Sequence, residues 1–577
     1  MILQALTTYY QTLVDRGEIS PPGWGQVKVS FALCIGENGE LEQVISVQTE
    51  QPKGKKIVLA PKMMTLPTPV KRSSGVAANF LCDNSSYFLG IDNKGKPKRS
   101  LECFGACQQL HERLLTNVDS PAARAVLAFF RNWQPEQAES NSEISAYSEE
   151  ILSGANLVFR FDGRYVHEDP MVCQAWDTYY QAAGDGPEMV CLVTGQYGPV
   201  ENIHPAIKNV QGAQSSGAAL VSFNAPAFCS YGKEQNLNAP TSKFASFAYT
   251  TALNQLLADR KHVYHVGDTT VVCWAEKGGD NYQNMIGWAL FDQQPCYTLS
   301  DMQSALQKLC NGDSVEIEDE LLDPDMGFYI LGISPNAARL SVRFFLQNTF
   351  GTFLQNAQAH QNRLEIVKPA YDKSDTISLW KLLDETVNQN SRDKTPVPNL
   401  SGEMLRAILN DTRYPATLLN GVTLRIRAEQ NITRGRAAIL KAYYLKNPHS
   451  QMPKEVLTVS LNPDSTNIPY NLGRIFSILE WIQSSANPGI NSTIKDRYFN
   501  SASATPARVF PVLMNLAQKH LKKLDEGKRI YFNKMLTELL SRLGERYPDY
   551  MSLPQQGAFQ LGYYHQTQAR FEKKEEK

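Results

Sequence analysis

The chain has 577 residues, of which 42% are hydrophobic and 20% charged, and its formal net charge is −1. This is an ordinary globular composition with enough apolar residues for several cores, so it excludes a largely disordered chain or a small disulfide-stapled domain. Residues 1–17 carry no cationic leader, and no apolar run approaches the roughly 18 residues of a membrane helix, so we predict neither a signal peptide nor a membrane span.

The small net charge conceals an uneven distribution. Residues 53–99 hold ten Lys and Arg against two Asp and Glu, and residues 401–577 hold 25 against 15. The balancing acidic excess lies mainly in residues 100–400. Two cationic regions on an otherwise acidic chain favour contacts with phosphates, as in nucleic-acid binding. A solvated surface that is merely uneven is the alternative.

The first 390 residues combine strand-like and helical segments. Apolar or β-branched runs predict strands at residues 27–35, 157–161, 189–194, 219–223, 269–275, 328–334 and 340–347. Residues 120–133 predict a helix, with Ser120 as N-cap and Pro121 in its first turn, and residues 241–259 predict another. We expect an inserted subdomain near residues 100–200 and an exposed acidic excursion at 134–150.

The ten cysteines all lie between Cys34 and Cys310, and no two form a CxxC pair. This pattern predicts reduced, mostly buried thiols in a cytosolic protein. Cys103 and Cys107 lie one helical turn apart, but no second half of a metal site is evident. We therefore predict that both pack in the core.

Residues 391–400 read as a linker, and the pattern after Leu400 becomes almost continuously helical. Apolar residues recur three and four apart in residues 402–410, 434–446, 474–485, 507–524 and 528–547. One such stripe consists of Phe532, Met535, Leu536, Leu539, Leu540 and Leu543. The sequence thus predicts an α+β, multidomain protein: a mixed α/β region over 1–390 and a helical bundle over 401–577.

Signals for enzymatic chemistry are weak. The chain has no GxxxxGK[ST] phosphate loop, HExxH, GxSxG or GxGxxG motif. His262 and His265 stand three apart in a strand-like run, so they face opposite sides and do not form a metal pair. The acidic stretch 316–327 reads as a solvated loop rather than a two-metal site. We predict no cofactor and no bound metal.

Two stretches repeat the pattern Ser-Ser-Gly followed by small apolar residues. The first lies in residues 71–92, behind a Lys-Arg pair, and the second in residues 214–223. Glycine allows close approach of backbone to a ligand, and Ser, Asn and Gln can donate to phosphate oxygens or to base-edge acceptors. The alternative is that these side chains only cap neighbouring turns.

These stretches also carry a resemblance to a known family. The strings KRSSGVAANFLCDNSSYFLGID (71–92), HPAIKNVQGAQSSGAALVSFNAPAFCSYGKEQ (204–235) and FASFAYTTALNQLL (244–257), with the start MILQALTTYYQTL, resemble the large subunit of type I-C CRISPR effector complexes, which are RNA-guided Cascade assemblies. The resemblance spans most of the chain in length and order, and the two Ser-Gly loops are specific strings.

The resemblance implies a non-catalytic, prokaryotic and cytoplasmic DNA-binding subunit. Such a subunit reads the protospacer-adjacent motif in duplex DNA, promotes unwinding and R-loop formation, and supports the displaced strand. The implied partners are the guide RNA with the backbone and guide-end subunits, small helical subunits, the target DNA, and a helicase-nuclease that docks after R-loop formation.

We assign provisional roles within this reading. Lys71 and Arg72 are predicted to hold phosphates. The motif bases are predicted to meet a set of small polar residues, namely Ser73, Ser74, Gly75, Asn79 and Asn84. A wedge or strand contact is predicted for the second loop, namely Gln214, Ser215, Ser216, Asn224 and Lys233.

Other readings stay open at this point. A purely structural scaffold would bind its neighbours without reading bases, and a metal-dependent nuclease would use residues 316–325. The family also implies that the helical end is made separately as a small subunit from an internal start, for which Met452 is our candidate.

Overall fold

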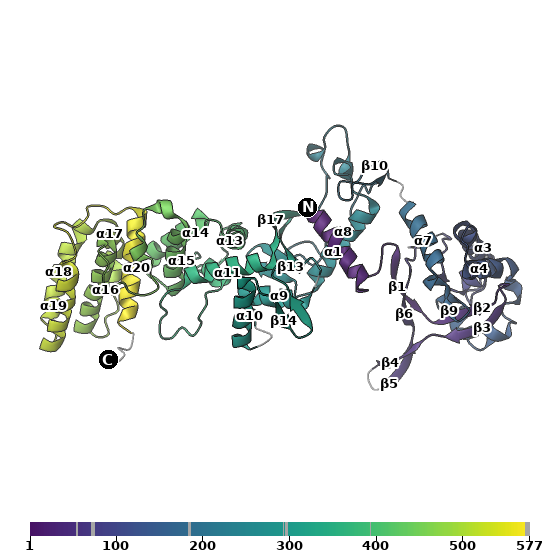
Figure 1. Ribbon diagram of the computed structural model, residues 1–577, viewed down its shortest axis with the longest axis horizontal. Helices are drawn as coiled ribbons and strands as arrows, with labels where there is room; N and C mark the ends of the chain where they lie inside the picture. The colour runs from purple at the N-terminus through teal and green to yellow at the C-terminus, as the bar shows by residue number, and fades with distance from the viewer. Residues whose placement is uncertain are drawn as a thin grey trace. The chain divides into compact units, whose positions relative to one another are not determined.

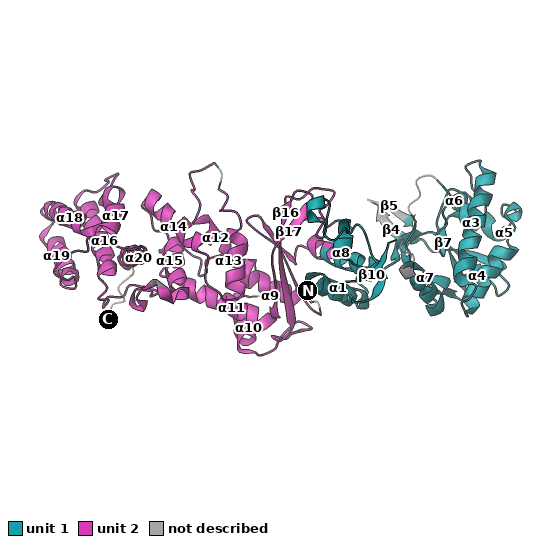
Figure 2. Cartoon of the chain, turned by 90° about the horizontal axis from the view of Figure 1, so that it is seen from above, with its two compact units in different colours: residues 1–206, 221–253 teal, residues 207–220, 254–577 magenta. Residues whose placement is uncertain are grey.

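A computed structural model describes residues 1–53, 56–70, 75–182, 186–277, 279–291, 293–294, 298–392 and 394–571. Its contacts divide the chain into two compact units, residues 1–206 with 221–253, and residues 207–220 with 254–577 (Figure 2). Strands and helices mix in the first part and helices follow toward the C-terminus, which confirms the α+β class (Figure 1). Residues 391–400 fall within the second unit, and the division at this segment stays a prediction.

The first unit is built on a sheet with the strand order β3 (Leu41–Ser46), β2 (Phe31–Ile35), β8 (Leu157–Phe161) and β7 (Cys82–Asp83), and β9 (Arg164–Tyr165) also pairs with β8. Strands β2 and β8 run parallel, so the chain between them must cross over. The crossover contains α2 (Ser85–Phe88), α3 (Pro97–Leu115) and α4 (Pro121–Asn132). Residues of the stretch 100–200 therefore share a sheet with the strands before them.

Aromatic packing and capping explain why this crossover folds onto the sheet. Phe88 of α2 stacks on Phe159 of β8 with 4.5 Å between ring centres. The hydroxyl of Ser120 accepts hydrogen bonds from two main-chain N–H groups in the first turn of α4, and Pro121 occupies its first position, as the sequence predicted. The stretch 134–150 is less exposed than expected: in the short helix α5 (Ser142–Ser145), Ile144 is buried in this core.

Further elements of the first unit are α1 (Ile2–Asp15), α7 (Pro170–Ala182) and three antiparallel pairs. The pairs are β1 (Trp24–Val29) with β6 (Lys62–Pro67), β4 (Thr49–Lys53) with β5 (Lys56–Ala60), and β10 (Glu188–Val190) with β11 (Tyr197–Pro199). The strand predicted at 189–194 ends at Val190, because the main-chain N–H of Thr194 turns back to the sulfur of Cys191. Helix α8 (Lys243–Ala258) forms as predicted.

The second unit contains an antiparallel sheet with the order β12 (Val263–Val266), β13 (Thr269–Ala275), β16 (Gly327–Asn336) and β17 (Arg339–Thr349). Around it lie α9 (Asp280–Phe291), α10 (Leu299–Asn311), α11 (Phe350–Leu364) and the hairpin β14 (Val315–Ile317) with β15 (Glu320–Leu322). The strand predicted at 219–223 is reduced to a single parallel bridge between Ala219 and Arg339 of β17.

Nine helices follow: α12 (Leu379–Asp384), α13 (Leu400–Leu409), α14 (Ala416–Glu429), α15 (Arg434–Lys446), α16 (Ile468–Ala486), α17 (Ile494–Ala504), α18 (Pro506–Leu521), α19 (Glu526–Leu540) and α20 (Leu553–Ala569), counted over the described residues (Figure 1). The predicted apolar stripe of α19 faces the core: Phe532, Leu536 and Leu539 are buried, and the rest of the stripe packs against the same core. Within the described parts of the chain, no helix has the length and apolarity to cross a membrane.

Helices α16 and α20 approach each other unusually closely. A Cβ atom added at Gly473 of α16 would lie 1.9 Å from the carbonyl oxygen of Phe559, and one added at Gly562 of α20 would lie 2.1 Å from that of Tyr470. Since no side chain fits at these distances, glycine at both positions allows the two backbones to touch.

Candidate nucleic-acid interface

The first Ser-Gly loop is held in place from its C-terminal side. The carboxylate of Asp83 is only 1% exposed and accepts two hydrogen bonds of 2.9 Å, one from the main-chain N–H of Asn79 and one from that of Asn84. Leu81 has a left-handed φ of 59°, and its N–H donates to Nε2 of the buried His111 at 3.1 Å. These contacts fix residues 79–84 as an ordered turn.

Part of the predicted site lies beyond what the structure describes. Lys71, Arg72, Ser73 and Ser74 fall outside the described residues, so their predicted roles stay predictions. Gly75 is described: it is exposed, and its φ of +154° lies in the range that favours glycine.

The two asparagines of this loop take part in turns. The side-chain oxygen of Asn79 accepts from the N–H of Val70 at 2.9 Å, and that of Asn84 caps α2 by accepting from the N–H of Ser86 at 3.1 Å. These bonds match the turn-capping role, which the sequence offers as the alternative to ligand binding. They use only the amide oxygens, and each side chain also carries an NH₂ group that can donate.

Four cations lie exposed beside this loop, namely Lys94, Lys96, Lys98 and Arg99. The guanidinium of Arg99 donates to the carbonyl oxygen of Gly75 at 3.4 Å, so the cations and the loop form one surface. The first turn of α3 contains no acidic residue. We call Gly75, Asn79, Lys94, Lys96, Lys98 and Arg99 the loop–cation surface.

A neighbouring carboxylate stays charged at the base of this surface. Burial acts to raise the pKa of Asp92, but hydrogen bonds from the N–H of Lys94 and the hydroxyl of Ser86 outweigh it and hold the pKa below its ordinary value. The ionised Asp92 thereby fixes the turn that presents Lys94 and Lys96.

The residues predicted in the second loop are all exposed, as a binding role requires. Gln214, Ser215 and Ser216 belong to the second unit, whereas Asn224 and Lys233 belong to the first, so their grouping stays a prediction. A turn closed by Gly217 N–H on the carbonyl of Gln214, at 2.9 Å, presents the first three. Over the described residues, no hydrogen bond joins the first loop to Asn224 or Lys233.

The basic excess after residue 400 has two different uses. On α15, Arg434 pairs with Asp372 at 3.0 Å, and Arg436 pairs with Glu385 at 3.1 Å and Glu429 at 2.6 Å. Both arginines are buried, so these charges hold the fold together and do not face a ligand. Sequence reasoning missed this role, because two of the three carboxylates lie before the helical region.

Other cations remain on the outside, around the turn between α18 and α19: Lys519, Lys522, Lys523, Lys528 and Arg529. Lys528 lies 3.2 Å from Asp525 and Arg529 lies 4.0 Å from Glu526. Exposed pairs of this kind are weak and are easily exchanged for a phosphate. This turn therefore presents an exposed cationic cluster in the helical region.

The structure also locates the histidines and cysteines that we did not expect to bind a metal. His262 is buried and its Nδ1 lies 2.8 Å from the carbonyl of Cys273, whereas His265 points outward, as strand alternation predicted. Cys103 and Cys107 are buried in the first core, and the described cysteines are free thiols. Among the described residues, no three or more His, Cys, Asp and Glu side chains are grouped as a metal site would need.

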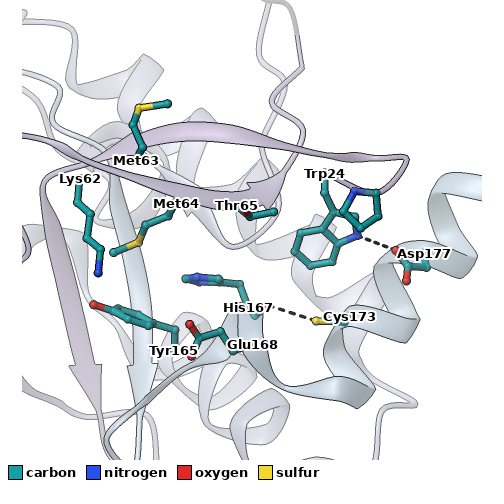
Figure 3. Close-up of a pocket in the computed structure, with 11 residues that line it drawn as sticks. Trp24, Lys62, Met63, Met64, Thr65, Tyr165, His167, Glu168, Cys173 and Asp177 are labelled. Atoms are coloured by element: carbon teal, nitrogen blue, oxygen red, sulfur yellow. Dashed lines mark hydrogen bonds between the residues drawn. The ribbon is translucent and has the colours of Figure 1, made fainter. Parts of the chain in front are cut away.

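One pocket was not foreseen from the sequence. It is an open pocket of about 510 Å³ in the first unit, lined by residues of β1, β6, β9, the short 3-10 helix Val166–Glu168 and α7, among them Trp24, Lys62, Tyr165 and His167 (Figure 3). Its lining comes from three separate stretches of the chain, and no local motif marks them.

The chain matches a known protein family. The family model described as CRISPR-associated protein (Cas_Csd1) matches residues 6–571, nearly the whole chain. A search of curated proteins returns no match.

Proposed function

Because the chain belongs to the CRISPR-associated Csd1 family, the large subunits of type I-C CRISPR effector complexes, we propose that it reads the protospacer-adjacent motif of target DNA. The observation that carries this proposal is the loop–cation surface. There, a loop fixed by a buried carboxylate carries an amide donor beside four exposed cations.

In the proposed mechanism the cations and the loop divide the work. Lys94, Lys96 and Lys98, together with Lys71 and Arg72, hold DNA phosphates and set the register. The NH₂ group of Asn79 donates to an acceptor on a base edge, and in the minor groove A·T pairs offer only acceptors. Ser73, Ser74, Gly75 and Asn84 bring short donors and backbone to the same groove.

The rest of the chain acts downstream of this contact. Exposed side chains of the second loop wedge or line the opened duplex, and the helical region, with its cations around the α18–α19 turn, supports the guide–target duplex and the displaced strand. The chain has no catalysis of its own and offers a docking surface for a helicase-nuclease. It works in a prokaryotic cytoplasm with the guide RNA, the backbone and guide-end subunits and small helical subunits.

The first test is a gel-shift titration of the assembled guide complex, with and without this chain. The target duplexes differ only in the adjacent motif. Tight binding that needs both the chain and the correct motif is the expected result. Equal improvement on every duplex would favour a scaffold without base readout, and divalent-metal-dependent cleavage by the isolated chain would favour a nuclease.

A double-mutant cycle then separates base readout from turn capping. Asn79→Asp keeps the oxygen that accepts from Val70 N–H and removes only the donor, whereas Asn79→Ala removes both. If the donor reads a base, both variants lose about 1–3 kcal/mol of discrimination at one motif position. Asn79→Asp also adds a negative charge whose effect depends on the base it meets, so the uncharged Asn79→Ala sets the size of the loss. Loss on all sequences alike would reduce Asn79 to a turn residue.

A further inference from the structure

The pocket in the first unit has walls suited to a flat ring. Tyr165 and His167 stack with 5.2 Å between ring centres and an angle of 25°, and the buried Met64 faces them from β6 (Figure 3). Trp24 closes the other end. The volume of about 510 Å³ falls within the range of roughly 300–1,000 Å³ that is usual for small-molecule sites.

One polar side chain in this pocket is buried without a partner. His167 is only 6% exposed and lines the cavity, and its buried Nδ1 has no hydrogen-bond partner among the described residues. Burial lowers the pKa of this imidazole to about 4, so the ring is neutral at pH 7 and offers one donor and one acceptor. A buried polar group left unsatisfied is costly unless a ligand pairs with it.

The Tyr165 end of the cavity carries two cations and also the carboxylate of Glu168. Lys62 points toward the Tyr165 end (Figure 3), where the guanidinium of Arg160 also lies 5.9 Å from the ring centre. At the other end, Asp177 accepts a 2.7 Å hydrogen bond from the indole of Trp24. A nucleotide matches these groups, with an anionic phosphate for the cations and base N–H donors for the carboxylates Asp177 and Glu168.

We propose that this pocket binds one unpaired nucleotide, with its base between Trp24 and the Tyr165–His167 stack and its phosphate at Lys62. Stacking of bases on aromatic side chains holds unpaired strands with little regard to sequence. His167 pairs with the base edge inside the cavity. The proposal rests on the proposed function only for the source of the nucleotide, which is an opened DNA strand or an unpaired part of the guide RNA.

The binding test uses the purified full-length chain and the 5′-monophosphates of adenosine, guanosine, cytidine, uridine and thymidine. Tryptophan fluorescence is recorded for the chain and for Trp24→Phe, which removes the reporter in the pocket. We expect a saturable change that disappears in Trp24→Phe. His167→Phe keeps the ring shape and should weaken binding about tenfold, the effect of one lost hydrogen bond. Lys62→Gln, at an exposed position, should weaken it severalfold.

Several results would overturn the proposal. The first is no saturable change with any nucleotide. The second is that Lys62→Gln and His167→Phe bind nucleotides as tightly as the unchanged chain does. The third is saturable binding of arginine amide in place of nucleotides, which would assign the pocket to a cationic side chain of a partner protein. His204→Phe, at another buried histidine of the first unit, is the matched control and should bind nucleotides normally.

The source of the nucleotide is read in the assembled complex. 2-Aminopurine is placed either in the guide RNA or in the displaced DNA strand, and the arm whose fluorescence changes in His167→Phe identifies the strand. Motif discrimination by gel shift is measured in parallel. Nucleotide binding without motif discrimination would support the pocket proposal and contradict the motif-reading function. Motif discrimination without nucleotide binding would support the motif-reading function and contradict the pocket proposal.

Discussion

The main-chain N–H of Asn79 donates to the buried carboxylate of Asp83 at 2.9 Å, four residues further along the chain. The same carboxylate holds the N–H of Asn84. The segment that carries the candidate donor is therefore held by a carboxylate that is itself buried. Because Asp83 holds the segment and Asn79 carries the donor, the two roles can be tested with separate variants.

We expect Asp83→Ala to lower the free energy of unfolding of the first unit by about 1–3 kcal/mol, because it leaves two partly buried N–H groups without their acceptor. Motif discrimination should fall with it, since Asn79 loses its position. Thermal unfolding and the gel shift give the two readouts. Asp119→Ala, at a carboxylate that is 92% exposed, is the control and should change neither. A stable Asp83→Ala chain with full discrimination would contradict this account.

Replacement of Lys94, Lys96 and Lys98 by Gln should flatten the salt dependence of DNA binding. Each phosphate contact contributes roughly 0.9 to the slope of log K against log salt, so the triple variant should lose about 2–3. Arg99 is left in place because it also holds Gly75. The matched control replaces three exposed cations elsewhere in the first unit, Arg16, Lys28 and Arg124. An equal change in slope for both triples would mean that the charge acts generally and not at this surface.

The contact between α16 and α20 should tolerate no side chain. Gly562→Ala places a methyl carbon 2.1 Å from the carbonyl oxygen of Tyr470, so the helices must separate. We expect a loss of about 3 kcal/mol, the upper part of the usual cost of overpacking. Gly527→Ala in α19 meets only ordinary contacts and should stabilise its helix by up to about 1 kcal/mol. Denaturant unfolding of both variants checks this difference in stability. Similar unfolding midpoints for Gly562→Ala and Gly527→Ala would contradict it.

Buried His111 predicts a loss of stability in mild acid. Burial lowers its pKa to about 4, against about 6.5 in an unfolded chain. Between these values the unfolded chain binds a proton that the folded chain does not, so stability is complete above pH 6.5 and falls as the pH drops toward 4. His111→Gln, which keeps an acceptor for Leu81 N–H, should flatten part of this fall in the thermal midpoint.

The exposed His449→Gln provides the comparison for that experiment. Its profile should follow that of the unchanged chain from pH 7 to pH 4. If His111→Gln also gave the profile of the unchanged chain, His111 would not contribute to the loss of stability in acid.

A separate start at Met452 would produce a fragment with all of α16–α20. It has 126 residues and a mass of about 14 kDa, scaled from 64.6 kDa for the whole chain. Mass spectrometry of the assembled complex from cells should find it, and Met452→Leu should remove it. Its absence from the unchanged complex would end this idea.

Local signals predicted much of the fold. Ser120 and Pro121 marked the start of α4, and the β-branched run 269–275 became β13 with the predicted bounds. Where the sequence pattern misled, distant partners were responsible. The run 219–223 has strand character, but only Ala219 of this run forms a bridge. Its partner is Arg339, 120 residues further along the chain, which the local pattern cannot reveal.

The candidate site was predicted only in part for the same reason. The Ser-Gly loop could be seen locally, and so could the cations that follow it. The roles of Asp83 and His111 could not, since they depend on hydrogen bonds to the main chain that no composition reveals. Arg436 looked like an available cation until Glu385 and Glu429 were seen to surround it.

The bridge at Ala219 has a consequence for how loop variants should be designed. Ala219 bonds to the main chain at Ala338 and Leu340, at 3.0 and 2.9 Å, and so covers one end of the outer edge of β17. An uncovered strand edge is a template on which another chain can pair and aggregate. Deletion of residues 214–223 would therefore open a route to self-association as well as remove polar side chains. Substitutions confined to Gln214, Ser215 and Ser216 leave the edge covered, and they keep solubility apart from recognition.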